Sequence, residues 1–95
     1  MLESVIESAL VRQCKAKGGW AFKFTSPGTA GVPDRLVLFK DRHMGFVELK
    51  APGKTLRPIQ ERRKKQLEAL GYDVFVVDSL DQVPGVIKKI TGGDE

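Results

Sequence analysis

The shortness of the chain constrains its fold most strongly, because 95 residues can build one hydrophobic core and leave no material for a second. One compact domain with one principal site is therefore expected. Hydrophobic residues make up 41% of the chain and charged residues 29%, a mixture that is typical of a globular fold rather than of a disordered chain. We expect the domain to span residues 1–90 and a flexible polar tail to occupy residues 91–95.

Composition also excludes several classes of protein. No stretch approaches the roughly 20 apolar residues of a membrane span, and the first residues lack the layout of a secretion signal, so we expect a cytoplasmic protein without membrane contact. The single cysteine, Cys14, cannot form an internal disulfide, and with His43 as the one histidine it gives no set of soft ligands for zinc. Any metal is therefore expected to bind through oxygen. The net charge of +4 mildly favours a polyanionic partner.

Hydrophobic periodicity in the first half of the chain predicts a helix followed by strands. Apolar residues at helical spacing predict a helix over residues 2–17, which ends at a pair of glycines. Short runs rich in aromatic and β-branched residues then predict three strands, at 20–24, 35–39 and 46–49. The turn at 40–45 makes the last two strands an antiparallel hairpin.

The second half predicts a helix, a strand and a short last helix. Pro58 suits the first turn of a helix that runs to Leu70. Residues 74–77 are nearly all apolar, which favours a strand in the buried middle of the sheet over an edge strand. A short helix is predicted after Ser79, ending near Ile90. The fold class expected is therefore α/β in the order α-β-β-β-α-β-α, with a mixed central sheet flanked by helices.

The pattern that carries chemical information is Pro33-Asp34, followed after one strand by Glu48-Leu49-Lys50. Alternate side chains of a strand share a face, so Glu48 and Lys50 point the same way, and Asp34 at the mouth of the preceding strand can meet Glu48. Two carboxylates that meet would repel unless a cation lies between them, and hard oxygen ligands suit Mg²⁺ or Mn²⁺. The backbone carbonyl of Leu49 is a further candidate ligand.

Such a site predicts hydrolysis of a phosphodiester bond. The metal would neutralise charge on the scissile phosphate and lower the pKa of a bound water, while the Lys50 amine would orient that water or stabilise the developing charge. The pattern is short, however, and Glu48 with Lys50 also fits an ordinary ion pair on a sheet surface. Its place on two predicted strands a hairpin apart, directly after a glycine-rich loop, favours the catalytic interpretation.

Five segments spread over nearly the whole chain together resemble one known family. They are Glu3-x-x-Ile6, Gly31-Val32-Pro33-Asp34, Val47-Glu48-Leu49-Lys50-Ala51, Leu56 with Gln60, and Gly71-Tyr72-Asp73-Val74. In these segments the chain is similar to the virus-type replication-repair nuclease (VRR-NUC) domain of the PD-(D/E)xK superfamily, whose core is restriction-endonuclease-like. The resemblance implies a stand-alone domain of phages or bacteria that forms homodimers and cleaves branched DNA, such as four-way (Holliday) junctions.

The resemblance also implies roles for individual residues. By it, Asp34 and Glu48 are metal ligands, Lys50 is the catalytic lysine, Gln60 is a supporting site residue, and a glutamate of the first helix completes the metal shell. Helical geometry places Glu3 near the edge of the apolar stripe and turns Glu7 further toward solvent, so we take Glu3 and keep Glu7 as the alternative.

Polar and basic residues around the predicted site are candidates for contact with DNA. They are Ser26, Thr29, Lys54, Arg57, Arg63 and Lys64. For the cationic run at 62–65, contact with DNA and plain solvation fit the sequence equally well. Arg63 projects toward the apolar side of its helix, so it has to snorkel or meet an anionic partner, such as a DNA phosphate or a site carboxylate.

The aromatic residues of the first strand and the histidine are expected to be structural. Trp20 and Phe22 alternate within a predicted strand, so we expect them in the core rather than as platforms for stacked bases. His43 lies in a predicted hairpin tip away from the motif and is assigned no part in catalysis.

Three functions are compatible with these observations. The first is a metal-dependent endonuclease for branched DNA, because a domain this small has little surface for reading sequence and recognition of DNA shape would suffice. A dimer would supply the two sites needed to cut both strands of a symmetric branch. The second is a nicking, flap-type or restriction-like nuclease with the same chemistry. The third is a non-catalytic DNA-binding subunit of a repair or helicase complex, which the presence of Asp34, Glu48 and Lys50 disfavours.

Overall fold

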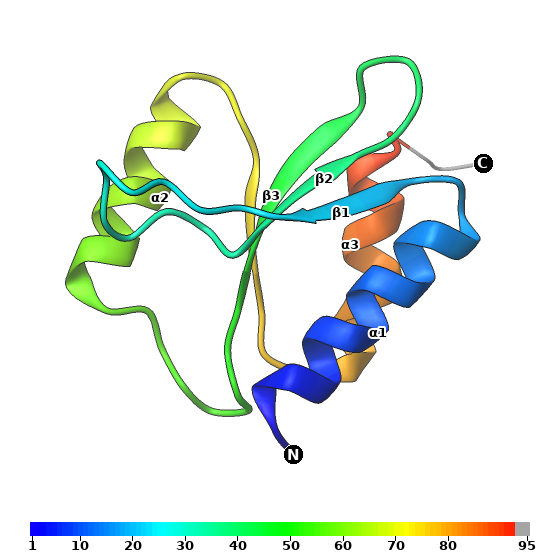
Figure 1. Ribbon diagram of the computed structural model, residues 1–95, viewed down its shortest axis with the longest axis horizontal. Helices are drawn as coiled ribbons and strands as arrows, with labels where there is room; N and C mark the ends of the chain where they lie inside the picture. Colours follow the sequence, from blue (N-terminus) through cyan, green and yellow to red (C-terminus); the bar gives the residue numbers. More distant parts are fainter. Residues whose placement is uncertain (93–95) are drawn as a thin grey trace.

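A four-stranded sheet organises the chain, and the computed structural model describes it within residues 1–92 (Figure 1). The elements in order are α1 (Glu3–Ala16), β1 (Trp20–Lys23), β2 (Arg35–Leu38), β3 (Met44–Leu49), α2 (Pro58–Ala69), β4 (Val74–Val77), a 3-10 turn η1 (Leu80–Gln82) and α3 (Val83–Ile90). The predicted fold class and order of elements are confirmed. Most of the tail expected at 91–95 lies outside the described residues.

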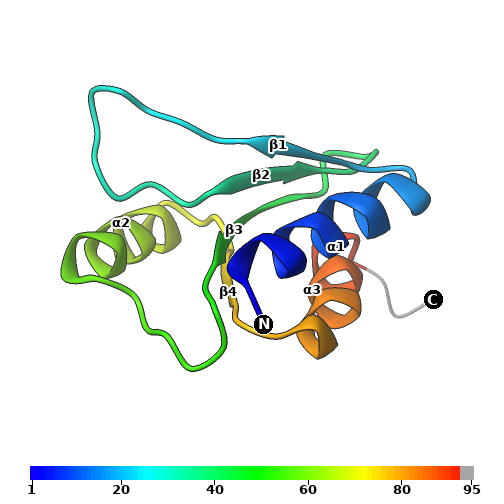
Figure 2. The same ribbon diagram turned by 60° about the horizontal axis from the view of Figure 1, so that its bottom comes forward.

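The sheet is mixed and its strands follow sequence order, β1-β2-β3-β4. β1 pairs with β2 and β2 with β3 antiparallel, whereas β3 and β4 are parallel and are joined by the crossover through α2. The expectation that residues 74–77 lie in the middle of the sheet is wrong, because β4 is an edge strand in the described fold. Its apolar sequence has another cause. Figure 2 shows α2 on one side of β3 and β4 and the α1–α3 pair on the other, so β4 is covered on both faces.

The hydrophobic core fills the space between one face of the sheet and the helices α1 and α3. It is built from three groups of buried side chains: Ile6, Leu10 and Cys14 of α1; Val83, Val86, Ile87 and Ile90 of α3; and Ala21, Val37, Val47, Leu49 and Val77 of the sheet. Since side chains alternate along a strand, Glu48 and Lys50 project from the opposite face, the one that α2 partly covers. The core therefore holds the strands while their other face remains available for a site.

Local signals set the ends of these elements. α1 ends just before Gly18, whose φ of +85° is favourable only for a residue without a side chain. The β2–β3 hairpin turns through Asp41 and Arg42, which both have positive φ. α2 begins at Pro58, where the missing N–H of proline costs no helical hydrogen bond. Within residues 1–92, no helix combines the length and the apolar character needed to cross a membrane.

Candidate active site

The predicted motif comes together where β2 begins and β3 ends. The backbone N–H of Phe24 donates to the carbonyl of Asp34 at 2.8 Å, which continues the β1–β2 ladder past the end of both strands. The Asp34 Oδ2 then accepts the backbone N–H of Leu49, also at 2.8 Å. This bond orients the Asp34 carboxylate toward the last residues of β3. Together these two bonds place the first acidic group of the motif at the end of β3, beside the second.

Pro33 leaves the carbonyl of Leu49 without a partner in the β2–β3 ladder. The register pairs Arg35 with Val47, so continuing it by two residues would set Pro33 opposite Leu49. That pair would be a hydrogen-bonded one, but proline has no N–H to donate to the Leu49 carbonyl. The N–H of Leu49 donates to the Asp34 side chain. The Leu49 carbonyl points to the same side of β3 as its N–H, which keeps it a candidate oxygen ligand beside the Asp34 carboxylate.

Glu48 is buried, with 3% of its surface exposed, and its carboxyl group is hydrogen-bonded to that of Asp34. The pKa of Glu48 is raised from its ordinary value of 4.5 to about 8, first by burial and then by the hydrogen bond to Asp34 and the negative charge of Asp34. The nearby Lys50 ammonium lowers this pKa, and Glu3 raises it. Near neutral pH, Glu48 therefore keeps a proton in its contact with Asp34.

The structure separates the two first-helix glutamates. Glu7 Oε2 accepts from Arg35 Nε at 2.9 Å and lies 3.4 Å from Lys23 Nζ. Glu3, in the first turn of α1, lies close enough to Glu48 to raise its pKa. Of the two alternatives, Glu7 is held in ion pairs, whereas the charge of Glu3 acts on Glu48. Within residues 1–92, the structure gathers no group of three or more Asp, Glu, His or Cys side chains that could hold a metal ion.

Gln60 is buried in the first turn of α2, with 8% of its surface exposed. Its Oε1 accepts the backbone N–H of Arg57 at 2.8 Å, so the side chain caps the helix at the N3 position. The Arg57 side chain is exposed. The hydrogen bond that the structure gives to Gln60 therefore fixes the start of α2, and the supporting role in the site expected for Gln60 rests on the family resemblance.

Arg63 joins α2 to the loop that precedes Asp34. Its Nε donates to the carbonyl of Ala30 at 2.7 Å, and its Nη1 donates to Gln66 Oε1 at 3.0 Å. Within the chain, the Arg63 guanidinium therefore contacts neutral oxygens, and its contact with a DNA phosphate stays a prediction. Next to it, Gly31 has φ +81°, and an added Cβ would lie 2.8 Å from the carbonyl oxygen of Ile59. The loop is thus held against α2 just before it delivers Asp34 to the site.

The other candidates for DNA contact lie around this loop and helix. Thr29 and Lys54 are exposed, and Ser26 is half-buried in a turn closed by a 3.0 Å hydrogen bond from the Thr29 N–H to the Ser26 carbonyl. Lys64 Nζ lies 2.9 Å from Glu68 Oε2, an ion pair one helical turn apart. The charge of Lys64 is therefore partly balanced within α2, whereas Lys54 and Arg57 extend into solvent from the segment after β3.

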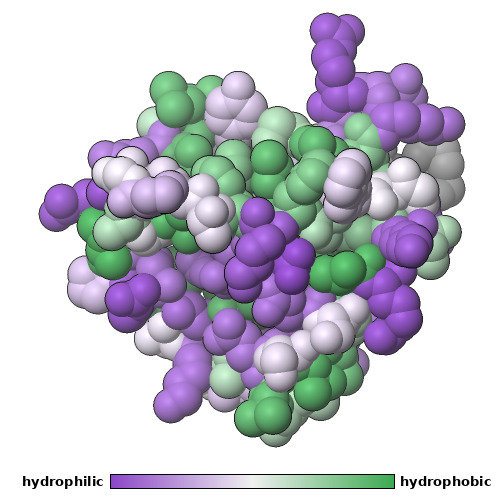
Figure 3. Space-filling view, viewed as in Figure 1, coloured by the Kyte–Doolittle hydropathy of each residue, from purple (hydrophilic) through white to green (hydrophobic). Residues whose placement is uncertain are grey.

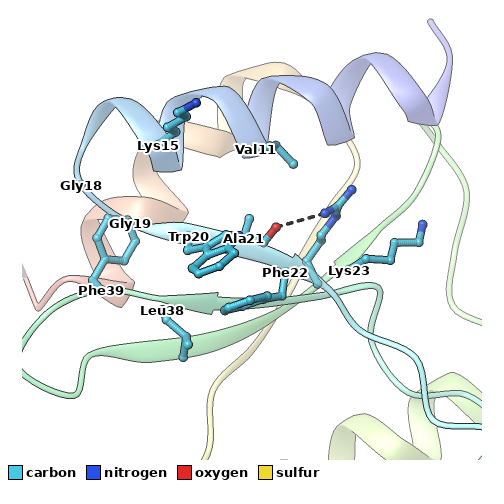
Figure 4. Close-up of a pocket in the computed structure, with 11 residues that line it drawn as sticks. Val11, Lys15, Gly18, Gly19, Trp20, Ala21, Phe22, Lys23, Leu38 and Phe39 are labelled. Atoms are coloured by element: carbon cyan, nitrogen blue, oxygen red, sulfur yellow. Dashed lines mark hydrogen bonds between the residues drawn. The ribbon is translucent and has the colours of Figure 1, made fainter.

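A hollow of about 830 Å³ runs along β1, outside the motif (Figure 4). Trp20 lines it and is 64% exposed, so the expectation that Trp20 belongs to the core is wrong. Sequence alternation correctly put Trp20 and Phe22 on one face of a strand, but it could not show that α2 leaves this part of the face uncovered.

Figure 3 shows hydrophobic side chains gathered over β2 and β3 on the side of the sheet next to α2. Phe22 is half-buried.

Comparisons with known proteins found relatives of the chain. No protein-family model matches the chain. The curated protein "Putative nuclease p44" of Acyrthosiphon pisum secondary endosymbiont phage 1 is 49% identical over 79 residues, which cover 83% of this chain and 85% of that protein. A solved structure described as "VRR_NUC domain" matches with a TM-score of 0.84 and 31% identity, over 90% of this chain and 94% of that chain. Both likenesses extend over most of the fold, including the strands that carry Asp34 and Glu48, and the chain therefore belongs to the virus-type replication-repair nuclease (VRR_NUC) family.

Proposed function

We propose that the chain is a metal-dependent endodeoxyribonuclease whose active site is formed by Asp34, Glu48 and Lys50 within a nuclease domain of residues 1–90. The observation that carries the proposal is the contact of the buried Glu48 carboxyl group with the half-buried Asp34 carboxyl group, with the Lys50 amine close to Glu48. A buried acid held against a second acid is costly to maintain for stability alone. Such an arrangement is the kind that active sites use.

The donor set fits a hard divalent cation such as Mg²⁺ or Mn²⁺. The Asp34 and Glu48 carboxylates would hold the cation, with the Leu49 carbonyl as a third ligand. Glu3 would be a fourth ligand if the first turn of α1 moves closer to the cation. All of these groups offer oxygen, which is the atom that both ions prefer. When bound, the cation supplies positive charge to the scissile phosphate and lowers the pKa of the attacking water.

The chain's own groups prepare this chemistry. The Leu49 N–H holds one oxygen of Asp34 at 2.8 Å and thereby fixes the direction of its other oxygen. Lys50 lies on the same strand face as Glu48, so its ammonium group can donate hydrogen bonds to a phosphate oxygen or to water at the same place. Its positive charge stabilises the negative charge that develops on the phosphate as the bond breaks.

The substrate that we propose is branched DNA, with the four-way junction first, cut by a homodimer that carries two sites. The likeness to the VRR_NUC domain supports this, together with the small size of a fold that can read DNA shape more easily than sequence. A nicking, flap-type or restriction-like nuclease is the alternative with the same chemistry. The likeness to a phage protein supports action on DNA inside a bacterial cell, in the cytoplasm.

Cleavage assays test this proposal. Labelled junction, flap, single-stranded and linear duplex DNA would be incubated with the protein and Mg²⁺, Mn²⁺ or EDTA. We expect the junction to be cut fastest with metal and EDTA to stop cutting. Lys50→Ala should lower the rate by about 100-fold or more with DNA binding largely kept, because it removes charge from the transition state.

Lys89→Ala is the matched control, since Lys89 is an exposed lysine of α3 on the far side of the sheet from Lys50. It should cut at the rate of the unmodified protein. Cleavage that persists in EDTA would contradict the role of the metal. A Lys50→Ala protein that cuts at the normal rate would remove Lys50 from the site.

A further inference from the structure

Trp20 presents an open aromatic surface at the start of the edge strand β1. Its ring is stacked on that of Phe22, with ring centroids 4.0 Å apart and planes inclined by 25°. One face of the indole is therefore occupied by Phe22, and yet 64% of the residue is exposed. Figure 4 shows the two rings together beneath β1, with Leu38 on the neighbouring strand. The stacked pair is a rigid flat surface of the kind on which a further planar group can stack.

The surroundings of this surface are positively charged. Lys15 of α1, Lys23 of β1 and Arg35 of β2 line the same hollow, and within residues 1–92 no acidic residue lines it. These three residues lie on the α1 side of β1, whereas Trp20 and Phe22 lie on its other side, so the hollow passes around the free edge of β1. The Arg35 guanidinium is engaged by Glu7 and by the Ala21 carbonyl, to which it donates at 3.0 Å. Lys15 is exposed, and Lys23 is 62% exposed with a single long contact of 3.4 Å to Glu7. Two lysines can therefore approach an anion at the free edge of β1, across that edge from the aromatic pair.

The aromatic pair lies on the same face of the sheet as the proposed active site. The strand register aligns Phe22 with Leu36 and then Phe46, two residues before Glu48 on the same face. At its other end β1 brings Lys23 opposite Arg35, the residue after Asp34. At about 3.3 Å per residue, Trp20 lies about 10 Å along β1 from Lys23. A strand of DNA leaving the site can run along β1 within a few nucleotides.

We propose that an unpaired base of bound DNA stacks on Trp20 while Lys15 and Lys23 approach the adjoining phosphates. This inference rests on the proposed function, since it adds a stacking platform to the same site. Aromatic stacking beside a cationic groove is a general way to hold single-stranded nucleic acid without regard to sequence. The feature would add affinity for DNA that exposes an unpaired base near the cleaved bond.

A second copy of the chain is the less favoured occupant of this surface. Among residues 1–92, the hydrophobic side chains of the hollow that are more than a third exposed are Trp20 and Leu38. An aromatic side chain buries about 150–250 Å² and a stable interface needs about 800 Å² from each partner, so two partly exposed side chains fall well short. Two chains of net charge +4 would also bring like charges together here, whereas DNA brings the opposite charge.

Tryptophan fluorescence tests the proposal directly, because Trp20 is the one tryptophan of the chain. The protein would be titrated in EDTA with a short oligothymidine, which excludes cleavage, while binding is followed independently by the anisotropy of a label on the DNA. We expect the Trp20 emission to be quenched in proportion to the DNA bound, and a Lys50→Ala protein to show the same quenching. This measurement uses the unmodified side chain, so it does not depend on how a variant folds.

Variants then measure the contribution of the ring. Trp20→Leu should weaken binding of the oligothymidine by about 5- to 100-fold, the range for loss of one base–aromatic stack, and change binding of linear duplex much less. Tyr72→Leu is the control, because Tyr72 is also an exposed aromatic residue, at 46%, but it does not line the hollow. Tyr72→Leu should bind the oligothymidine as the unmodified protein does.

Three results would overturn the proposal. The first is DNA binding without quenching of Trp20, and the second is a folded Trp20→Leu protein with unchanged affinity for single strands. The third is sedimentation that shows a dimer for the unmodified protein and a monomer for Trp20→Leu, which would make the surface an interface between copies. Quenching without cleavage of any substrate would contradict the proposed function and support this inference. Cleavage without quenching would support the proposed function and contradict this inference.

Discussion

Glu48 is a carboxyl group buried against another carboxyl group, and its raised pKa has a consequence for stability. In the metal-free protein the folded state keeps a proton on Glu48 up to about pH 8, whereas the unfolded chain releases it near 4.5. Folding is therefore favoured by this group below pH 4.5, and that stabilisation is lost as the pH rises through the folded pKa. The loss is on the order of a few kcal/mol between pH 4.5 and 8.

Glu48→Gln isolates this effect, because glutamine is neutral at every pH and its amide can still donate to Asp34. In EDTA, we expect the variant to match the unmodified protein near pH 4.5 and to be the more stable of the two at pH 8, as measured by urea unfolding. The other titrating groups are common to both proteins and cancel in the difference. A constant difference across this pH range would mean that Glu48 does not hold a proton in the folded state.

At the scale of the elements, the loop before Asp34 depends on its contact with α2. Gly31→Ala should destabilise the protein by about 1–3 kcal/mol, because φ is +81° and the added Cβ would lie 2.8 Å from the Ile59 carbonyl oxygen. It should also slow cleavage, since the loop positions Asp34. Gly28→Ala is the matched control, as nothing lies within 4 Å of its added Cβ. Urea unfolding and cleavage rates check both variants, and equal effects at the two glycines would show that the loop is not held against α2.

The elements also show what the sequence could and could not predict. Helix and strand positions follow from local periodicity, and so does the common face of Glu48 and Lys50. The edge position of β4 did not follow, because an apolar strand covered by helices on both faces reads like a central strand. The exposure of Trp20 and the Arg63 contact with Ala30 depend on where α2 packs, and that is a tertiary property without a local signal.

At the scale of the whole molecule, the proposed paired cuts in a junction require two sites in one particle. We expect sedimentation to give a mass of twice the 10.5 kDa chain at the concentrations used for cleavage. Dilution below the dimer dissociation constant should convert paired cuts into single nicks, as seen on a junction in a supercoiled plasmid. Paired cuts made by a protein that remains monomeric at every concentration would contradict the need for two copies.

The central claim is that Asp34 and Glu48 share one cation, and calorimetry tests it most directly. Mn²⁺ would be titrated at pH 7 into the unmodified protein and into Glu48→Gln, in buffers of different ionisation enthalpy. Since Glu48 is mostly protonated below its pKa of about 8, we predict that the unmodified protein binds Mn²⁺ and releases close to one proton per ion. Glu48→Gln should bind Mn²⁺ at least tenfold more weakly and release almost none. Equal affinity and equal proton release in the two proteins would contradict the account.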